Sequence, residues 1–82
     1  MNRITVNLYY HLKDKVGTNL INLELPENST IKELKMILIH DYPALQSQLD
    51  NIMTLINQKI TLDADVIPLN AQVSFLTPIG GG

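Results

Sequence analysis

The residues that could carry chemistry lie at the C-terminal end, where the sequence reads Thr77-Pro-Ile-Gly-Gly-Gly82. Glycine has no side chain, so such a segment can enter a narrow channel and adopt backbone angles that other residues avoid. The five residues from Pro78 onward could extend by roughly 17 Å. We therefore predict that the terminal carboxylate of Gly82 is the reactive group. The residues expected to thread into the active sites of partner proteins are Pro78, Ile79, Gly80 and Gly81.

A second interpretation of the same residues is that the tail is inert. Glycine-rich termini also occur as frayed ends or as remnants of cloning. That interpretation predicts that removing Gly82 has no effect on activity, so the two interpretations can be separated by experiment.

Composition limits the class of protein. The 82 residues are 45% hydrophobic and 17% charged, which predicts one folded domain. A net charge of −2 argues against a nucleic-acid partner. No apolar run is long enough to span a membrane, and no signal peptide precedes the first strand pattern. The absence of cysteine removes thiolate nucleophiles and disulfides, and a cytoplasmic location is the simplest expectation.

Other side chains give weaker signals. His11 and His40 lie far apart in the sequence, with no ligand-like cluster of side chains, so both are expected to be loop or surface histidines. Asp63 and Asp65 begin like a calcium loop, but Ile67 occupies a position where that loop needs a ligand. We therefore predict a turn at these aspartates and no metal site.

Alternating apolar residues predict strands over Arg3–Tyr10 and Leu20–Leu25. The intervening residues His11–Val16 are consistent with one helical turn or a long loop. A capping-box spacing between Thr30 and Glu33 opens a helix expected to run from Ile31 to His40.

The second half of the chain contains shorter elements. Ala44–Leu49 can form a short helix at most, and Ile52–Asn57 predicts a strand inside the sheet. Lys59–Leu62 predicts a short edge strand after a turn at Asn57-Gln58. Gln72–Leu76 predicts the last strand.

This order of elements predicts an α+β protein with the β-grasp, or ubiquitin-like, fold. We expect a four- to five-stranded mixed sheet packed on one main helix, with the final strand in the middle. The domain is expected to cover residues 1–77 and a flexible C-terminal tail residues 78–82. Alternation places Phe75 in the core and Leu76 on the opposite face at the root of the tail. Phe75 and Leu76 are the residues that we expect to contribute to partner docking.

With this fold and tail, the chain resembles the MoaD/ThiS family of sulfur-carrier proteins, and within it the small subunits of molybdopterin synthase. Besides the terminal glycines, the segments that carry the resemblance are Tyr9-Tyr10, Leu12–Gly17, Thr30–Leu38, Tyr42–Leu45 and Ile56–Gln58. Two segments depart from the usual pattern. Thr77-Pro78-Ile79 replaces Pro-Pro-Val before the glycines, and Asn70-Ala71 replaces a Gly-Asp turn.

The resemblance implies a co-substrate more than an enzyme. An E1-like, MoeB-type enzyme would use ATP to adenylate Gly82, and sulfur from a donor protein would then convert the adenylate into a thiocarboxylate. A MoaE-like large subunit, in a heterotetramer, would use that sulfur to build the dithiolene of molybdopterin. No permanently bound cofactor is implied. The alternatives are a carrier for thiamine thiazole, tRNA thiolation or cysteine synthesis, and a ubiquitin-like modifier or binding module.

Overall fold

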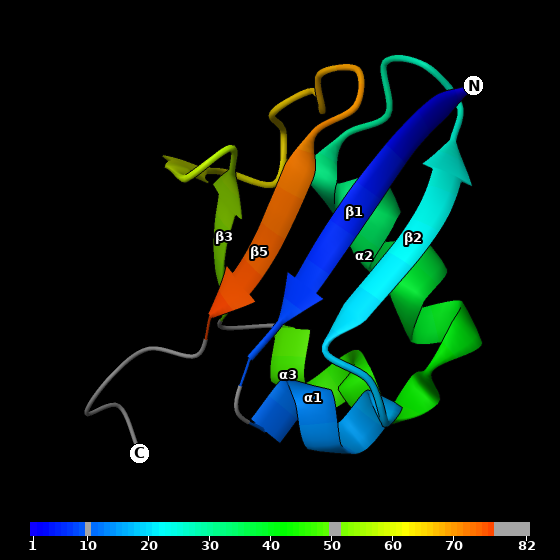
Figure 1. Cartoon of the computed structure of the whole chain (residues 1–82), viewed down its shortest axis with the longest axis vertical. Coiled ribbons are helices and arrows are strands. Elements are labelled where there is room, and N and C mark those ends of the chain that lie inside the picture. The colour runs from blue at the N-terminus through cyan, green and yellow to red at the C-terminus, as the bar shows by residue number, and fades with distance from the viewer. Residues whose placement is uncertain (10, 50–51, 77–82) are drawn as a thin grey trace.

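The computed structural model describes residues 1–9, 11–49 and 52–76. Within them, five strands form one sheet in the order β2-β1-β5-β3-β4, with the longest helix behind one face and shorter helices at the lower end of the strands (Figure 1). The strands are β1 (Asn2–Leu8), β2 (Leu20–Leu25), β3 (Met53–Ile56), β4 (Lys59–Thr61) and β5 (Gln72–Leu76). The helices are α1 (His11–Val16), α2 (Ile31–Asp41), a 3-10 helix (Pro43–Leu45) and α3 (Gln46–Leu49).

The two halves of the chain meet at the centre of the sheet. Strand β5 pairs in parallel with β1, with Val6 opposite Val73, and antiparallel with β3 on its other side. The N–H of Thr5 donates to the carbonyl of Ala71 at 3.1 Å and begins the parallel ladder. The last strand therefore lies in the middle, as predicted, and the β-grasp fold is confirmed.

Helix α2 begins as the sequence predicts. The Thr30 hydroxyl accepts a hydrogen bond from the N–H of Glu33 at 3.3 Å, and the Glu33 carboxylate accepts one from the N–H of Thr30 at 3.0 Å. The backbone N–H groups of Ile31 and Lys32, the first two residues of α2, donate to carbonyl groups in the loop after β4. That loop therefore completes the cap of the helix.

The core lies between α2 and the sheet. Alternate residues of each central strand face it, and α2 contributes the residues spaced for one helical face. Its members are Ile4, Val6, Leu8, Leu12, Leu25, Ile31, Leu34, Leu38, Leu45, Leu49, Ile56, Ile67, Ala71, Val73 and Phe75. Among the described residues, three polar ones are also buried: Asn2, Ser29 and Thr54.

The predicted elements differ from the structure mainly at their ends. Of the two alternatives predicted for His11–Val16, the helical one is observed. The first strand ends at Leu8, two residues before the predicted end. Tyr10 lies outside the described residues. Asn57 and Gln58 both adopt positive φ angles, which is the geometry of a tight hairpin turn between β3 and β4. No helix among the described residues is long and apolar enough to cross a membrane.

Candidate functional site

The predicted reactive terminus follows directly from the central strand. Strand β5 ends at Leu76, and the described part of the chain ends there too. Thr77 and the predicted tail residues lie outside the described residues; these tail residues are Pro78, Ile79, Gly80, Gly81 and Gly82. Their roles remain predictions. What the structure defines is the root from which the tail leaves.

The root is held on both sides by backbone pairing. Phe75 lies opposite Leu8 of β1 and opposite Thr54 of β3, while Leu76 lies opposite Met53. A strand with two neighbours has its N–H and C=O groups engaged in both directions, which restrains it more than an edge strand. The position of the tail root is therefore set by the whole sheet.

Phe75 and Leu76 have different environments. The Phe75 side chain is 0% exposed and packs in the core, so it offers no surface to a partner. Leu76 is half-buried and points to the opposite, helix-free face of the sheet. Of the two residues predicted to dock partners, only Leu76 has a side chain that can be reached in the free chain. Phe75 acts by fixing the strand.

Leu76 belongs to an apolar surface on the helix-free face, which we call the tail-root surface. It is formed by Met53, Leu55, Ile60 and Leu76. Met53 lies opposite Leu76, and Leu55 lies opposite Ile60. Met53, beside Leu76, is 40% exposed, and Ile60, on β4 at the far side of β3, is 70% exposed. Clustered exposed apolar side chains are typical of protein interaction sites.

Sequence reasoning identified Leu76 but missed its neighbours. Met53 and Leu55 lie two residues apart on β3, and that alternation is visible in the sequence. What the sequence does not show is that β3 is the strand next to β5 and that Met53 is in register with Leu76.

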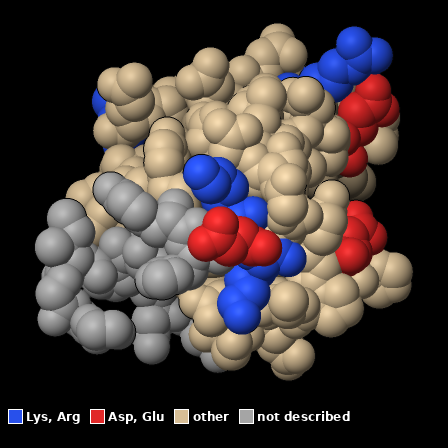
Figure 2. Space-filling model, turned by 60° about the horizontal axis from the view of Figure 1, so that its bottom comes forward, with Lys and Arg blue, Asp and Glu red and all other residues tan. Residues whose placement is uncertain are grey.

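On the face drawn in Figure 2, the charges of the described residues are of mixed sign. Figure 2 shows Lys or Arg side chains directly beside Asp or Glu side chains on one face, with uncharged surface around them. Helix α1 follows the same pattern, since Asp14 lies between Lys13 and Lys15. This surface offers no concentrated charge for nucleic acid.

The side chains considered as possible metal ligands include Asp63, Asp65 and His40. Asp63 pairs with Lys35 of α2 at 2.7 Å, and Asp65 accepts a hydrogen bond from the N–H of Leu62 at 2.8 Å. Both aspartates therefore stabilise a turn, as predicted. His40 is exposed and lies 3.3 Å from the carboxylate of Asp41. In the described parts of the chain, no group of three or more histidine, aspartate or glutamate side chains could hold a metal.

A mixed sheet with its last strand at the centre, packed on one main helix, defines the class of ubiquitin-like β-grasp proteins. The sequence matches the ThiS family over residues 6–82, and the chain belongs to that family. It is a small protein of the class that contains sulfur carriers and ubiquitin-like modifiers. A comparison with curated proteins found no match.

Solved structures share the fold at low sequence identity. The small archaeal modifier protein 1 of Haloferax volcanii superposes with a TM-score of 0.87 and 16% identity, over 96% of this chain and 100% of that one. A putative molybdopterin converting factor subunit 1 of Pyrococcus furiosus has a TM-score of 0.87 and 11% identity, over 96% and 100%. Subunits 1 and 2 of the molybdopterin-converting factor of Helicobacter pylori form a complex whose matching chain has a TM-score of 0.71 and 18% identity, over 98% and 99%.

Proposed function

We propose that this chain carries sulfur on Gly82 and donates it for the dithiolene of molybdopterin. The observation that carries the proposal is the central position of β5, which leads from an apolar surface directly into the glycine tail. The likeness to a putative molybdopterin converting factor subunit 1, and to a subunit 1 and 2 complex, supports the choice of this pathway.

The chemistry follows from the carboxylate. A carboxylate is a poor electrophile, so the terminal oxygen is first bonded to the α-phosphorus of ATP, and pyrophosphate leaves. Hydrosulfide then attacks the carbonyl carbon of the adenylate, AMP leaves, and a thiocarboxylate remains on Gly82. This chain supplies the Gly82 carboxyl group and the tail that carries it into the partner. The groups that bind ATP and move protons belong to a MoeB-like activating enzyme, and a sulfur donor protein supplies the sulfur.

The geometry suits such a carrier. The six residues after Leu76 can extend by about 20 Å, so the carboxylate can lie deep in a partner while the sheet stays outside. The tail-root surface lies beside the point of exit and supplies apolar contact area. In the proposed cycle this surface docks first on the activating enzyme and then on a MoaE-like large subunit, in a heterotetramer with two large subunits.

A second candidate function is protein modification. The same adenylate would be attacked by a lysine amine to form an isopeptide bond, with AMP as the leaving group. The observation in its favour is the TM-score of 0.87 to the small archaeal modifier protein 1 of Haloferax volcanii. Both candidates share the activation step and differ in the nucleophile.

The deciding experiment measures the intact mass of the chain after incubation with ATP, a MoeB-type enzyme and sulfide. We expect a shift corresponding to one oxygen replaced by sulfur, located in the C-terminal peptide. Addition of a MoaE-like subunit and a sulfur-free pterin precursor should return the mass to its original value. A chain lacking Gly82 is the control and should show no shift.

Other outcomes would contradict the proposal. A thiocarboxylate that forms but is not consumed by the pterin system would point to another sulfur pathway. Conjugates to lysine side chains, with no turnover of sulfur, would establish the modifier function instead.

A further inference from the structure

Strand β2 is one edge of the sheet, and among the described strands its one neighbour is β1 (Figure 1). The N–H of Leu8 donates to the carbonyl of Asn19 at 3.0 Å, which sets the phase of the β1–β2 ladder. Directly opposed residues of an antiparallel pair alternate between bonded and non-bonded pairs. The residues of β2 bonded to β1 are therefore Ile21, Leu23 and Leu25, whereas Leu20, Asn22 and Glu24 turn their N–H and C=O groups outward.

Both ends of this outer edge are closed. The Thr18 hydroxyl accepts a hydrogen bond from the N–H of Leu20 at 3.3 Å and donates one to its carbonyl at 3.2 Å. At the other end, Pro26 follows the strand and has no N–H to donate. Only Asn22 and Glu24 remain, and no hydrogen bond to their outward backbone groups occurs within the described residues.

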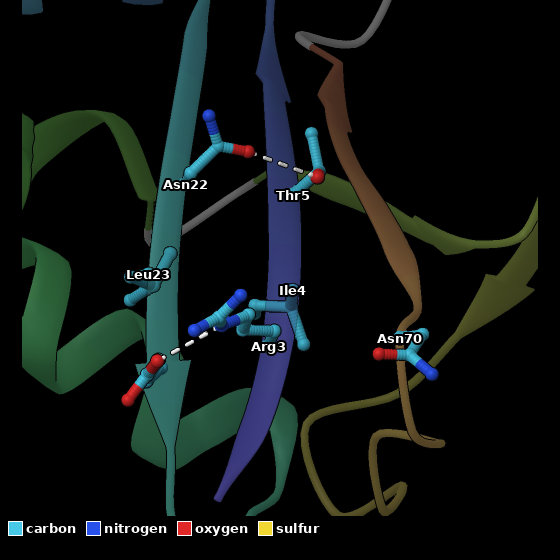
Figure 3. A pocket seen from close by; sticks show the side chains of 7 residues that line it. Arg3, Ile4, Thr5, Asn22, Leu23 and Asn70 are labelled. Atoms are coloured by element: carbon cyan, nitrogen blue, oxygen red, sulfur yellow. Dashed lines mark hydrogen bonds and ion pairs between the residues drawn. The ribbon is translucent and has the colours of Figure 1, made fainter.

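The side chains of this segment leave the edge uncovered. The Thr5 hydroxyl donates to Oδ1 of Asn22 at 3.1 Å, and Nε of Arg3 donates to Oε1 of Glu24 at 3.0 Å. Figure 3 shows Thr5 and Asn22 bonded across the strands, on the face where Arg3, Thr5, Asn22, Glu24 and Asn70 line a shallow hollow. Asn22 and Glu24 therefore lean over β1 and away from the outer edge.

A second β2 strand fits this edge in one antiparallel register. In this register Asn22 of each copy lies opposite Glu24 of the other. Each of these two pairs exchanges two backbone hydrogen bonds, so every outward N–H and C=O group of Asn22 and Glu24 has a partner. Shifting the pairing so that Glu24 faces Glu24 opposes like charges and puts Asn22 against Pro26, which cannot donate. Shifting it the other way puts Glu24 against Leu20, whose groups are already bound by Thr18.

The side chains match in the same register. Leu23 would face Leu23 of the second copy on the helix side of the sheet, where it is only half-buried in the single chain. On the other face, the Nδ2 group of Asn22 would lie opposite the carboxylate of Glu24, so an amide donor meets an acceptor. The sequence of the edge is thus complementary to itself.

We propose that two copies of this chain associate through β2, antiparallel about Leu23, to form one continuous sheet. Strand β1 separates β2 from β5, so the association leaves the tail-root surface uncovered. Each dimer presents two tails, and this holds for both candidate functions, sulfur transfer and protein modification. The inference does not depend on the proposed sulfur chemistry.

Sedimentation velocity over a range of protein concentrations tests the proposal with two variants at one position. Asn22→Lys places a positive charge opposite Glu24 of the second copy, and two such pairs should tighten the dimer by roughly two- to thirty-fold. Asn22→Glu places like charges opposite each other and should weaken the dimer by a similar factor. Both variants lose the native Asn22 side chain, so each is the matched control for the other.

The sign of the two effects is decisive. If the wild-type chain and Asn22→Lys both remain monomeric up to millimolar concentration, the proposal is overturned. It is also overturned if both variants weaken a dimer equally, because that result indicates a different register or surface. Circular dichroism and melting temperatures check that both variants retain the fold.

Discussion

Met53 lies directly opposite Leu76 where β3 and β5 pair, and both side chains point to the helix-free face of the sheet. The last residue of the strand that leads into the tail is thus joined, through the backbone ladder, to an exposed apolar neighbour. A partner that binds this surface also fixes the point from which the tail departs. In the proposed function, this relationship would let a partner bound at the tail-root surface also position the start of the tail.

A carboxylate in the tail-root surface should impair docking. We expect Met53→Asp and Ile60→Asp each to raise the KM for the activating enzyme by roughly tenfold, because the charge would be buried against apolar groups of the partner. Met36→Asp is the control, since Met36 is 61% exposed on α2 and outside this surface. Initial rates of thiocarboxylate formation measure the effect. Equal effects at Met36 and Met53 would show that the surface has no special role.

Changes at the end of the tail should abolish activation without changing stability. Deleting Gly82, or adding an alanine after it, removes the carboxylate from the position that the activating enzyme must reach. We expect complete loss of thiocarboxylate in the intact-mass assay. The melting temperature should be unchanged, because the core residues lie between Ile4 and Phe75. Normal activation of a chain extended by alanine would favour the inert-tail interpretation.

Thr54 should be replaceable by valine with a gain in stability. Its side chain is 3% exposed, and its hydroxyl oxygen has no hydrogen-bond partner among the described residues. Thr54→Val keeps the shape and removes a buried polar group, so the free energy of unfolding should rise by about 1 kcal/mol.

The neighbouring strand offers a matched control. The hydroxyl of Thr61 donates to the carbonyl of Thr54 at 3.2 Å, so Thr61→Val should lower stability by about 1 kcal/mol. Urea denaturation of both variants measures the two effects. A loss of stability in Thr54→Val would indicate that its hydroxyl is bonded after all.

The stability of the fold should be highly sensitive to substitution of Asn2. It is 1% exposed, and its Nδ2 group donates to the carbonyls of Ile67 at 3.3 Å and Pro68 at 2.9 Å. Its Oδ1 atom accepts from the N–H of Asn70 at 2.8 Å. Asn2→Ala leaves these backbone groups without partners and should lower the free energy of unfolding by about 3 kcal/mol.

Urea denaturation of Asn2→Asp, compared with Asn2→Ala, tests this explanation. Asn2→Asp keeps the acceptor for Asn70 but loses the two donated bonds, and it brings a charge into the interior. It should therefore rescue little of the lost stability. A variant of Asn2 that unfolds at the wild-type urea concentration would refute its role in joining the chain start to the loop before β5.

Much of the fold could be predicted because its signals are local. Thr30 and Glu33 lie three residues apart, and the capping box that their spacing predicts forms in the structure. The alternation along Gln72–Leu76 predicted that strand with its observed bounds. Hairpin, helix and final strand then leave few ways to close a sheet, and the central position of β5 followed from that restriction.

The sequence by itself determined the elements of this protein and the chemistry available to its glycine end. Tertiary structure alone decided which residues meet. Asn2 and Asn70 are hydrogen-bonded 68 positions apart, and nothing in the pattern around either one predicts it. Alternation along a strand shows which side chains share a face, but not which strand lies next to it. The pairing of Met53 with Leu76 and the open edge at Asn22 and Glu24 both depend on long-range strand pairing.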